Sequence, residues 1–125
     1  PDAVVLGCDT VVDVNGEVFG KPHSVEDAKR MLRALSGATH AVHTGVCISD
    51  GKRTESFVDS CRVTFFPLSA AEIDFYASTQ EPYDKAGAYA IQGRAALWLD
   101  RIEGDYYTIM GLPLSRTVQL LGHFL

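Results

Sequence analysis

The chain has 125 residues, of which 46% are hydrophobic and 22% are charged, and its formal net charge is −5. A chain of this length can bury enough surface for one core, so we expect a single domain over residues 1–125. The acidic balance argues against binding to the backbone of a DNA or RNA duplex, and no apolar run approaches the ~20 residues of a membrane span.

The first element is the apolar run VVLGCDTVV at residues 4–12, which predicts a strand buried on both faces with one carboxylate, Asp9, inside it. Removing an ionised carboxylate from water is costly unless something compensates it. Asp9 therefore either lies at a strand end facing a cavity or has a cationic partner. The competing interpretation is that Asp9 ends the strand and accepts backbone N–H groups in a turn.

A hairpin and a helix follow the first strand. The dipeptide Asn15-Gly16 favours a tight hairpin turn. Ser24 is placed to cap a helix, with Asp27 three residues later and apolar residues at helical spacing after it. Gly37 provides a stop signal. We expect a helix over residues 25–35.

The stretch 39–68 is rich in β-branched and aromatic residues around Asp50-Gly51, which predicts two long antiparallel strands. His40 and His43 lie three residues apart, so on a strand they face opposite sides and do not form a metal site.

The next helix begins at Ser69, a capping residue. The pattern AALWLDRI at residues 95–102 predicts a strand, and a helix follows Pro113.

The three cysteines Cys8, Cys47 and Cys61 are odd in number and lack C-x-x-C spacing, so neither a disulfide framework nor a zinc site is indicated. We interpret them as small buried side chains of a protein in the reducing cytoplasm.

The block EPYDKAGAYAIQG at residues 81–93 combines charges, small residues, an amide and two glycines. This composition does not suit a regular core element and favours a loop whose backbone lets a ligand approach closely. From composition alone, a surface loop with Asp84 and Lys85 in solvent is the simpler interpretation.

Five stretches occur in order along the chain: GCDTVV, GKP, the run from LSG through TH to VHTGV, EPYDKAGAYAIQG and IEGDYYTIMGLPL. As an ordered set they resemble the Maf family of nucleoside triphosphate pyrophosphatases over nearly the whole chain. The resemblance implies an α/β fold of the Maf/ITPase-like kind, with a strongly twisted mixed β-sheet, flanking helices and a long cleft. It also implies hydrolysis between the α- and β-phosphates of a nucleotide, with a divalent cation, Mg²⁺ or Mn²⁺, as cofactor.

The resemblance assigns the catalytic roles to two residues. Asp9 matches the aspartate of the family's Asp-Thr-Val-Val motif, implied as catalytic base and metal ligand, and Lys21 matches the lysine of its Gly-Lys-Pro loop, expected near phosphate. Hydrolysis of a phosphoanhydride needs a carboxylate to hold the metal or orient water, and cations to neutralise phosphate charge. These residue types agree with that chemistry.

Four further residues are implied in substrate binding. Thr10 and Gln92 match positions tied to substrate choice, and Asp84 and Lys85 match an acidic-basic pair. The expected substrate is a pyrimidine nucleoside triphosphate, dTTP or UTP. We expect no membrane partner and no nucleic-acid duplex, and a homodimer stays open.

Family members begin with a strand and a loop of pattern S-x-S-x-R-R that grips the triphosphate, a pattern absent from these 125 residues. We therefore expect an N-terminally truncated member. Two alternatives to the enzyme stay open: a regulator that binds nucleotide without turnover, and a remnant of the fold that binds no ligand.

Overall fold

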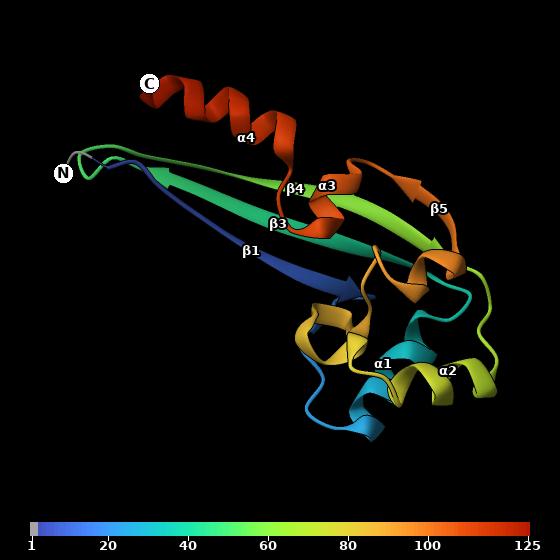
Figure 1. The fold of residues 1–125 in the computed structure, drawn as a ribbon. Helices are drawn as coiled ribbons and strands as arrows, with labels where there is room; N and C mark the ends of the chain where they lie inside the picture. Colours follow the sequence, from blue (N-terminus) through green and yellow to red (C-terminus); the bar gives the residue numbers. More distant parts are fainter. Residues whose placement is uncertain (1–2) are drawn as a thin grey trace.

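The computed structural model describes residues 3–125, which form one sheet with helices packed against part of it (Figure 1). The strand order is β2-β1-β3-β4-β5. The five strands are β1 (Val5–Val14), β2 (Glu17–Phe19), β3 (Thr39–Ser49), β4 (Thr54–Phe65) and β5 (Leu99–Glu103).

The helices are short and connect or follow the strands. The four α-helices are α1 (Val25–Leu35), α2 (Ala70–Ala77), α3 (Tyr106–Met110) and α4 (Leu114–Leu121). Single turns of 3₁₀-helix lie at η1 (Glu81–Asp84), η2 (Ala86–Ala88), η3 (Arg94–Trp98) and η4 (Gly122–Phe124). None of the helices among residues 3–125 is both long and apolar enough to cross a membrane.

The expected α/β fold with flanking helices is confirmed, but all described strand pairs are antiparallel, so the mixed pairing is not found here. Two tight turns explain part of this result. Asn15 and Gly16 both have positive φ, 51° and 89°, as a two-residue hairpin between β1 and β2 requires. Asp50 closes the β3–β4 turn by accepting the N–H groups of Lys52 and Arg53. Strands joined this closely run in opposite directions.

The caps expected from the sequence are present on both of the longer packed helices. The Ser24 hydroxyl accepts the N–H of Asp27 and begins α1 at the expected residue. Ser69 and Glu72 exchange hydrogen bonds at the start of α2 and form a complete capping box.

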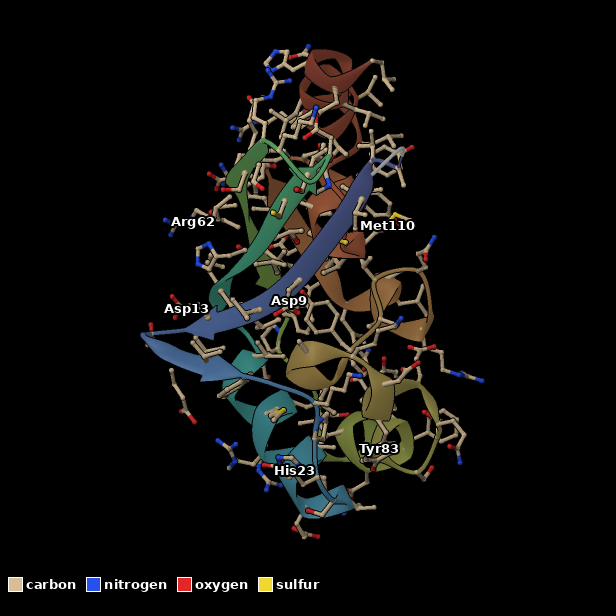
Figure 2. The ribbon with its side chains drawn as sticks, turned by 90° about the vertical axis from the view of Figure 1, so that its left-hand side faces the viewer. Asp9, Asp13, His23, Arg62, Tyr83 and Met110 are labelled. Carbon is tan, nitrogen blue, oxygen red and sulfur yellow. The ribbon has the colours of Figure 1, made fainter. Side chains whose placement is uncertain are left out.

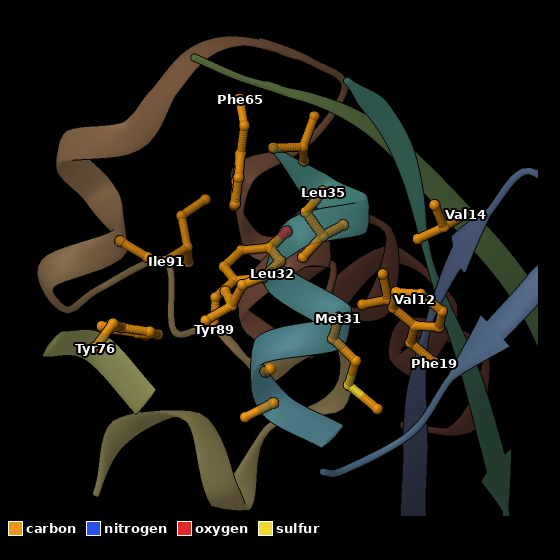
Figure 3. Packing of buried hydrophobic residues seen from close by; sticks show 14 of the residues in the cluster. Val12, Val14, Phe19, Met31, Leu32, Leu35, Phe65, Tyr76, Tyr89 and Ile91 are labelled. Atoms are coloured by element: carbon orange, nitrogen blue, oxygen red, sulfur yellow. The ribbon is translucent and has the colours of Figure 1, made fainter. Parts of the chain in front are cut away.

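The core lies between α1, the adjoining half of the sheet and the segment 86–95 (Figure 3). Leu32 and Leu35 on α1 are fully buried, as are Phe65 on β4 and Tyr76 on α2. Burying side chains of this size contributes about 1.5–3 kcal/mol each. This core therefore holds one end of the sheet against the loops that follow α2.

The other half of the sheet extends past α1 and α2 (Figure 1). In the described structure Val5 is 64% and Leu6 44% exposed, so the prediction that the first strand is buried on both faces is wrong for its first half. Cys8 and Cys47 lie on this half and are exposed, while Cys61 is buried. The cysteine prediction thus holds for Cys61 alone.

The strand expected at residues 95–102 begins later than predicted. Residues Arg94–Trp98 form the 3₁₀-turn η3, and β5 begins at Leu99. Leu97 is 83% exposed although the alternation placed it on a strand face. The turn brings Trp98 edge-to-face against Tyr76, with ring centroids 4.7 Å apart, so aromatic packing decides the local conformation.

Candidate active site in the cleft beside β1

One cavity of about 440 Å³ is lined by residues from five separate segments of the chain. Figure 2 labels two of its lining residues, Asp9 on β1 and Met110 at the end of α3. All six residues singled out in the sequence line it: Asp9, Thr10, Lys21, Asp84, Lys85 and Gln92. Their roles stay predictions, but their meeting in one cavity is a fact of the fold.

Asp9 lies in the middle of β1 and not at a strand end, and its side chain is exposed. The expectation of a strand-end carboxylate was therefore wrong. β1 pairs with β2 only at Val12–Val14. In the described structure, the part of β1 that includes Asp9 pairs with β3 on one side and with no strand on the other. Asp9 Oδ1 accepts the N–H of Thr10 at 3.0 Å, which holds the carboxylate at this edge. The other oxygen is left for a ligand in the cavity.

Lys21 reaches the cavity from the loop after β2, and a second loop is tied to it. The N–H of Gly87 donates to the carbonyl of Gly20 at 3.1 Å. Gly87 has φ 78°, and an added Cβ would lie 2.8 Å from Cγ2 of Val12, so only glycine suits this position. The loops that carry Lys21 and Lys85 are thus joined by their backbones and packed on β1.

Lysine side chains in the cavity are available to a ligand. The ion pairs found within residues 3–125 involve neither Lys21 nor Lys85. Both are exposed, and both line the cavity together with Asp9 and Asp84. Two flexible cations beside a carboxylate can neutralise a polyphosphate while leaving an acceptor for water or metal.

The turn that carries Gln92 is braced on both sides by Tyr76 and Glu81. The N–H of Ala90 donates to the Tyr76 hydroxyl at 3.1 Å, and the Tyr76 hydroxyl donates to Glu81. Glu81 Oε2 also accepts the N–H of Arg94 at 3.1 Å. Burial, with the Glu81 carboxylate, raises the pKa of Tyr76, so this hydroxyl keeps its proton. Glu81 and Tyr76 lie outside the site residues expected from the sequence, because their role depends on contacts with Ala90 and Arg94 that no local motif reveals.

His40 supports the buried side of the same segment. Its Nε2 lies 2.7 Å from the hydroxyl of Tyr89, a residue that lines the cavity, while its buried Nδ1 has no hydrogen-bond partner among residues 3–125. Burial lowers the pKa of His40 to about 4. A protonated ring would carry two N–H donors with one partner, so His40 is neutral in the folded protein. His43 lies on the opposite face beside Ser60, which confirms the prediction that the two histidines point apart.

Threonines connect β1, at the cavity, to α3 on the same face of the sheet. Thr10 pairs directly across the strands with Thr44, and their hydroxyl oxygens are 2.8 Å apart. Thr44 is fully buried and donates to the carbonyl oxygen of Thr108 on α3 at 2.7 Å. The sequence offered no signal for this contact, because it joins residues 64 positions apart.

The residues present suit a divalent cation held jointly by protein and substrate. Within residues 3–125 no group of three His, Cys, Asp or Glu side chains forms a ready cage. The cavity nevertheless contains two carboxylates, Asp9 and Asp84. Mg²⁺ is typically bound through one or two carboxylates together with substrate phosphates and water, so this donor set fits that mode.

Comparison with known proteins gives consistent matches. Residues 1–124 match the family model described as Maf-like protein. A dTTP/UTP pyrophosphatase of Bacillus velezensis is 52% identical over 124 residues, which are 99% of this chain and 66% of that protein. Proteins with the same name from Acholeplasma laidlawii and Bacillus pumilus are 51% and 48% identical, each over 99% of this chain and 65% or 66% of their own length. The chain thus spans slightly less than two thirds of these relatives.

Proposed function

Because the chain belongs to the Maf family, we propose that its cavity binds dTTP or UTP and that the protein hydrolyses the nucleotide to the monophosphate and pyrophosphate. The observation that carries the proposal is the meeting of Asp9, Lys21 and Lys85 in one cavity. The printed names of the similar proteins, dTTP/UTP pyrophosphatase, support the choice of nucleotide.

Asp9 acts first in the proposed reaction. Its carboxylate orients a water molecule toward the α-phosphorus and takes the proton as the new P–O bond forms. The bond from the α-phosphorus to the bridging oxygen breaks, and the electron pair leaves with pyrophosphate. The N–H of Thr10 holds Oδ1 of Asp9 at 3.0 Å, so the base is oriented before the substrate arrives.

Lys21 and Lys85 stabilise the charge that moves onto the leaving pyrophosphate. A cation positioned where charge develops lowers the barrier because it interacts more strongly with the transition state than with the substrate. Asp9 and Asp84 would hold a divalent cation, Mg²⁺ or Mn²⁺, which supplies further neutralisation of the phosphates when bound. Thr10 and Gln92 contact the nucleoside and select it.

We also place the protein in the cytoplasm, where its nucleotide substrates occur, without a membrane or nucleic-acid duplex as partner. The net charge of −5 supports the last point, because binding along a duplex requires a basic surface.

The test measures pyrophosphate release from dTTP, UTP and GTP by the protein expressed from its complete coding sequence, with Mg²⁺ or Mn²⁺. We expect release from dTTP and UTP and almost none from an Asp9→Asn variant. Equal behaviour of the two proteins would overturn the proposal. Calorimetry separates the remaining functions: heat on adding nucleotide without turnover means a regulator, and no heat means a remnant that binds nothing.

A further inference from the structure

A series of hydrogen bonds runs from the cavity across one face of the sheet, from β1 over β3 and α3 to β4. It begins with the Thr10 and Thr44 hydroxyls, 2.8 Å apart, and passes from Thr44 to the carbonyl oxygen of Thr108 at 2.7 Å. The Thr108 hydroxyl in turn donates to Oδ2 of Asp59 at 2.5 Å, and Arg116 donates to the other oxygen of Asp59 at 2.9 Å.

The direction of every proton in this line follows from counting donors. A threonine hydroxyl has one proton, and a carbonyl oxygen can only accept. Thr44 is fully buried and its proton points to the carbonyl of Thr108. In the bond between Thr10 and Thr44, Thr10 must therefore be the donor. The protons of all three hydroxyls point away from the cavity.

This direction leaves the Thr10 oxygen with only lone pairs to offer the cavity. Gly111 lies beside this oxygen, since an added Cβ there would lie 3.6 Å from Thr10 Oγ1. Thr10 and Gly111 both line the cavity. A ligand atom that meets Thr10 Oγ1 must consequently donate a hydrogen bond.

An N–H group of a base suits this position better than a cation does. Ile109 and Met110, next to Gly111, line the cavity with apolar surface, as a planar base requires. A cation would find stronger ligands in the carboxylates of Asp9 and Asp84 in the same cavity.

Gln92 cannot distinguish uracil from cytosine by itself. Its side chain is exposed, and no hydrogen bond within the described residues fixes its amide. A free amide can turn to present either its oxygen or its NH₂ group. It can therefore donate to the carbonyl next to N3 of uracil or, after turning, accept from the amino group of cytosine. Discrimination needs a group whose polarity is fixed.

We propose that Thr44 fixes Thr10 as a hydrogen-bond acceptor and thereby makes the cavity prefer uracil and thymine, which carry N3–H, over cytosine, whose N3 is an acceptor. Thr44 is a positioning residue, since it reaches the nucleotide only through Thr10. This inference rests on the proposed function, and it adds the origin of the choice between pyrimidines.

The test compares kcat/KM for UTP and CTP in the wild-type protein and in Thr44→Val, expressed from the complete coding sequence. Valine has a similar shape and no hydroxyl, so Thr10 becomes free to turn its proton toward the cavity. We expect wild type to prefer UTP and the ratio of kcat/KM for UTP to that for CTP to fall about fivefold or more in the variant, the order of effect for one mismatched polar contact. Thr44→Ser, which keeps the hydroxyl, should retain the preference.

Thr39→Val is the matched control. Thr39 also lies on β3 and pairs across the strands with Thr64 through hydroxyls 2.7 Å apart, but neither residue lines the cavity. This variant should leave the UTP/CTP ratio unchanged. A general loss of stability in Thr44→Val would lower the activities on UTP and CTP together and leave their ratio unchanged. An unchanged UTP/CTP ratio in this variant therefore overturns the inference. A wild-type protein that shows no preference for UTP over CTP also overturns it. Absence of turnover in the wild type would instead contradict the proposed function.

Discussion

The carboxylate of Glu81 fills the space beside Gly93 so closely that a Cβ on residue 93 would lie 1.9 Å from Oε1. A Gly93→Ala variant must therefore displace Glu81 and break its bonds to Tyr76 and to the N–H of Arg94. We expect a loss of roughly 2 to 4 kcal/mol in the free energy of unfolding and a fall in kcat/KM, because the turn carrying Gln92 loses its brace. Chemical denaturation measures the first and pyrophosphate release the second.

Gly122→Ala is the control for that experiment, since an added Cβ there meets nothing within 4 Å. Its stability and activity should equal those of wild type. Comparable losses in the two variants would show that the contact between Glu81 and Gly93 has no special role.

Asp9→Asn should abolish most of the activity at little cost in stability. Asp9 is exposed, and an asparagine oxygen can still accept the N–H of Thr10, so the strand keeps its hydrogen bond. The amide, however, is a weak base and a weaker metal ligand. The melting temperature and the rate of pyrophosphate release are measured side by side. An unfolded variant would identify Asp9 as a structural residue.

Lys21→Ala should weaken triphosphate binding and transition-state stabilisation together, with a penalty on the order of 2 to 4 kcal/mol in apparent activation free energy, the size typical for losing one charge-stabilising donor. Lys29→Ala is a suitable comparison, because Lys29 pairs with Asp74 on the surface outside the cavity. A change in kcat/KM of less than about tenfold for Lys21→Ala would place this lysine outside the reaction.

Gln92→Glu should shift base preference. The amide can donate to the carbonyl next to N3 of uracil or thymine, whereas the N1–H and N2–H₂ edge of guanine presents only donors. Glutamate accepts from both of those donors. We expect kcat/KM to fall for dTTP and UTP. The ratio of kcat/KM for GTP to that for dTTP or UTP should rise by about ten- to a hundredfold. Equal losses on every nucleotide would mean that Gln92 only braces its turn.

The buried histidine makes stability depend on pH. The pKa of His40 is lowered by burial to about 4 from its ordinary value of 6.5, so the unfolded chain binds a proton that the folded chain refuses. Stability from this source is therefore complete above pH 6.5 and declines as the pH falls toward 4, by about 3 kcal/mol over that range. His40→Gln should flatten this part of the curve of unfolding free energy against pH. The carboxylates titrate in both proteins, so they contribute equally to the two curves. If the curves for wild type and His40→Gln ran parallel, His40 would not be the source of the pH dependence.

Local signals in the sequence predicted the regular elements well. The cap at Ser24, the capping box at Ser69 and the turn at Asn15-Gly16 each depend on residues within a few positions of one another, and the structure confirms all three. The six site residues came from the ordered motifs, and the fold gathers them into one cavity.

What the sequence could not supply were contacts between distant segments. The alternation at residues 95–102 predicted a strand, but packing of Trp98 on Tyr76 produces a turn first. The line from Thr10 to Asp59 joins four elements through side chains whose types are common in ordinary strands. An apolar pattern also does not specify which layer covers it, so Val5 and Leu6 were expected to be buried and are exposed.

The bond from the N–H of Gly87 to the carbonyl of Gly20 joins the loop of Lys21 to the turn after Lys85. Deuterium can replace the Gly87 amide proton only when these two segments separate, so its exchange rate reports opening of the cleft as one event. The cleft consequently cannot admit or release a nucleotide by moving either loop alone without breaking this bond. A nucleotide held by both lysines is therefore expected to slow the exchange of a proton that it does not touch.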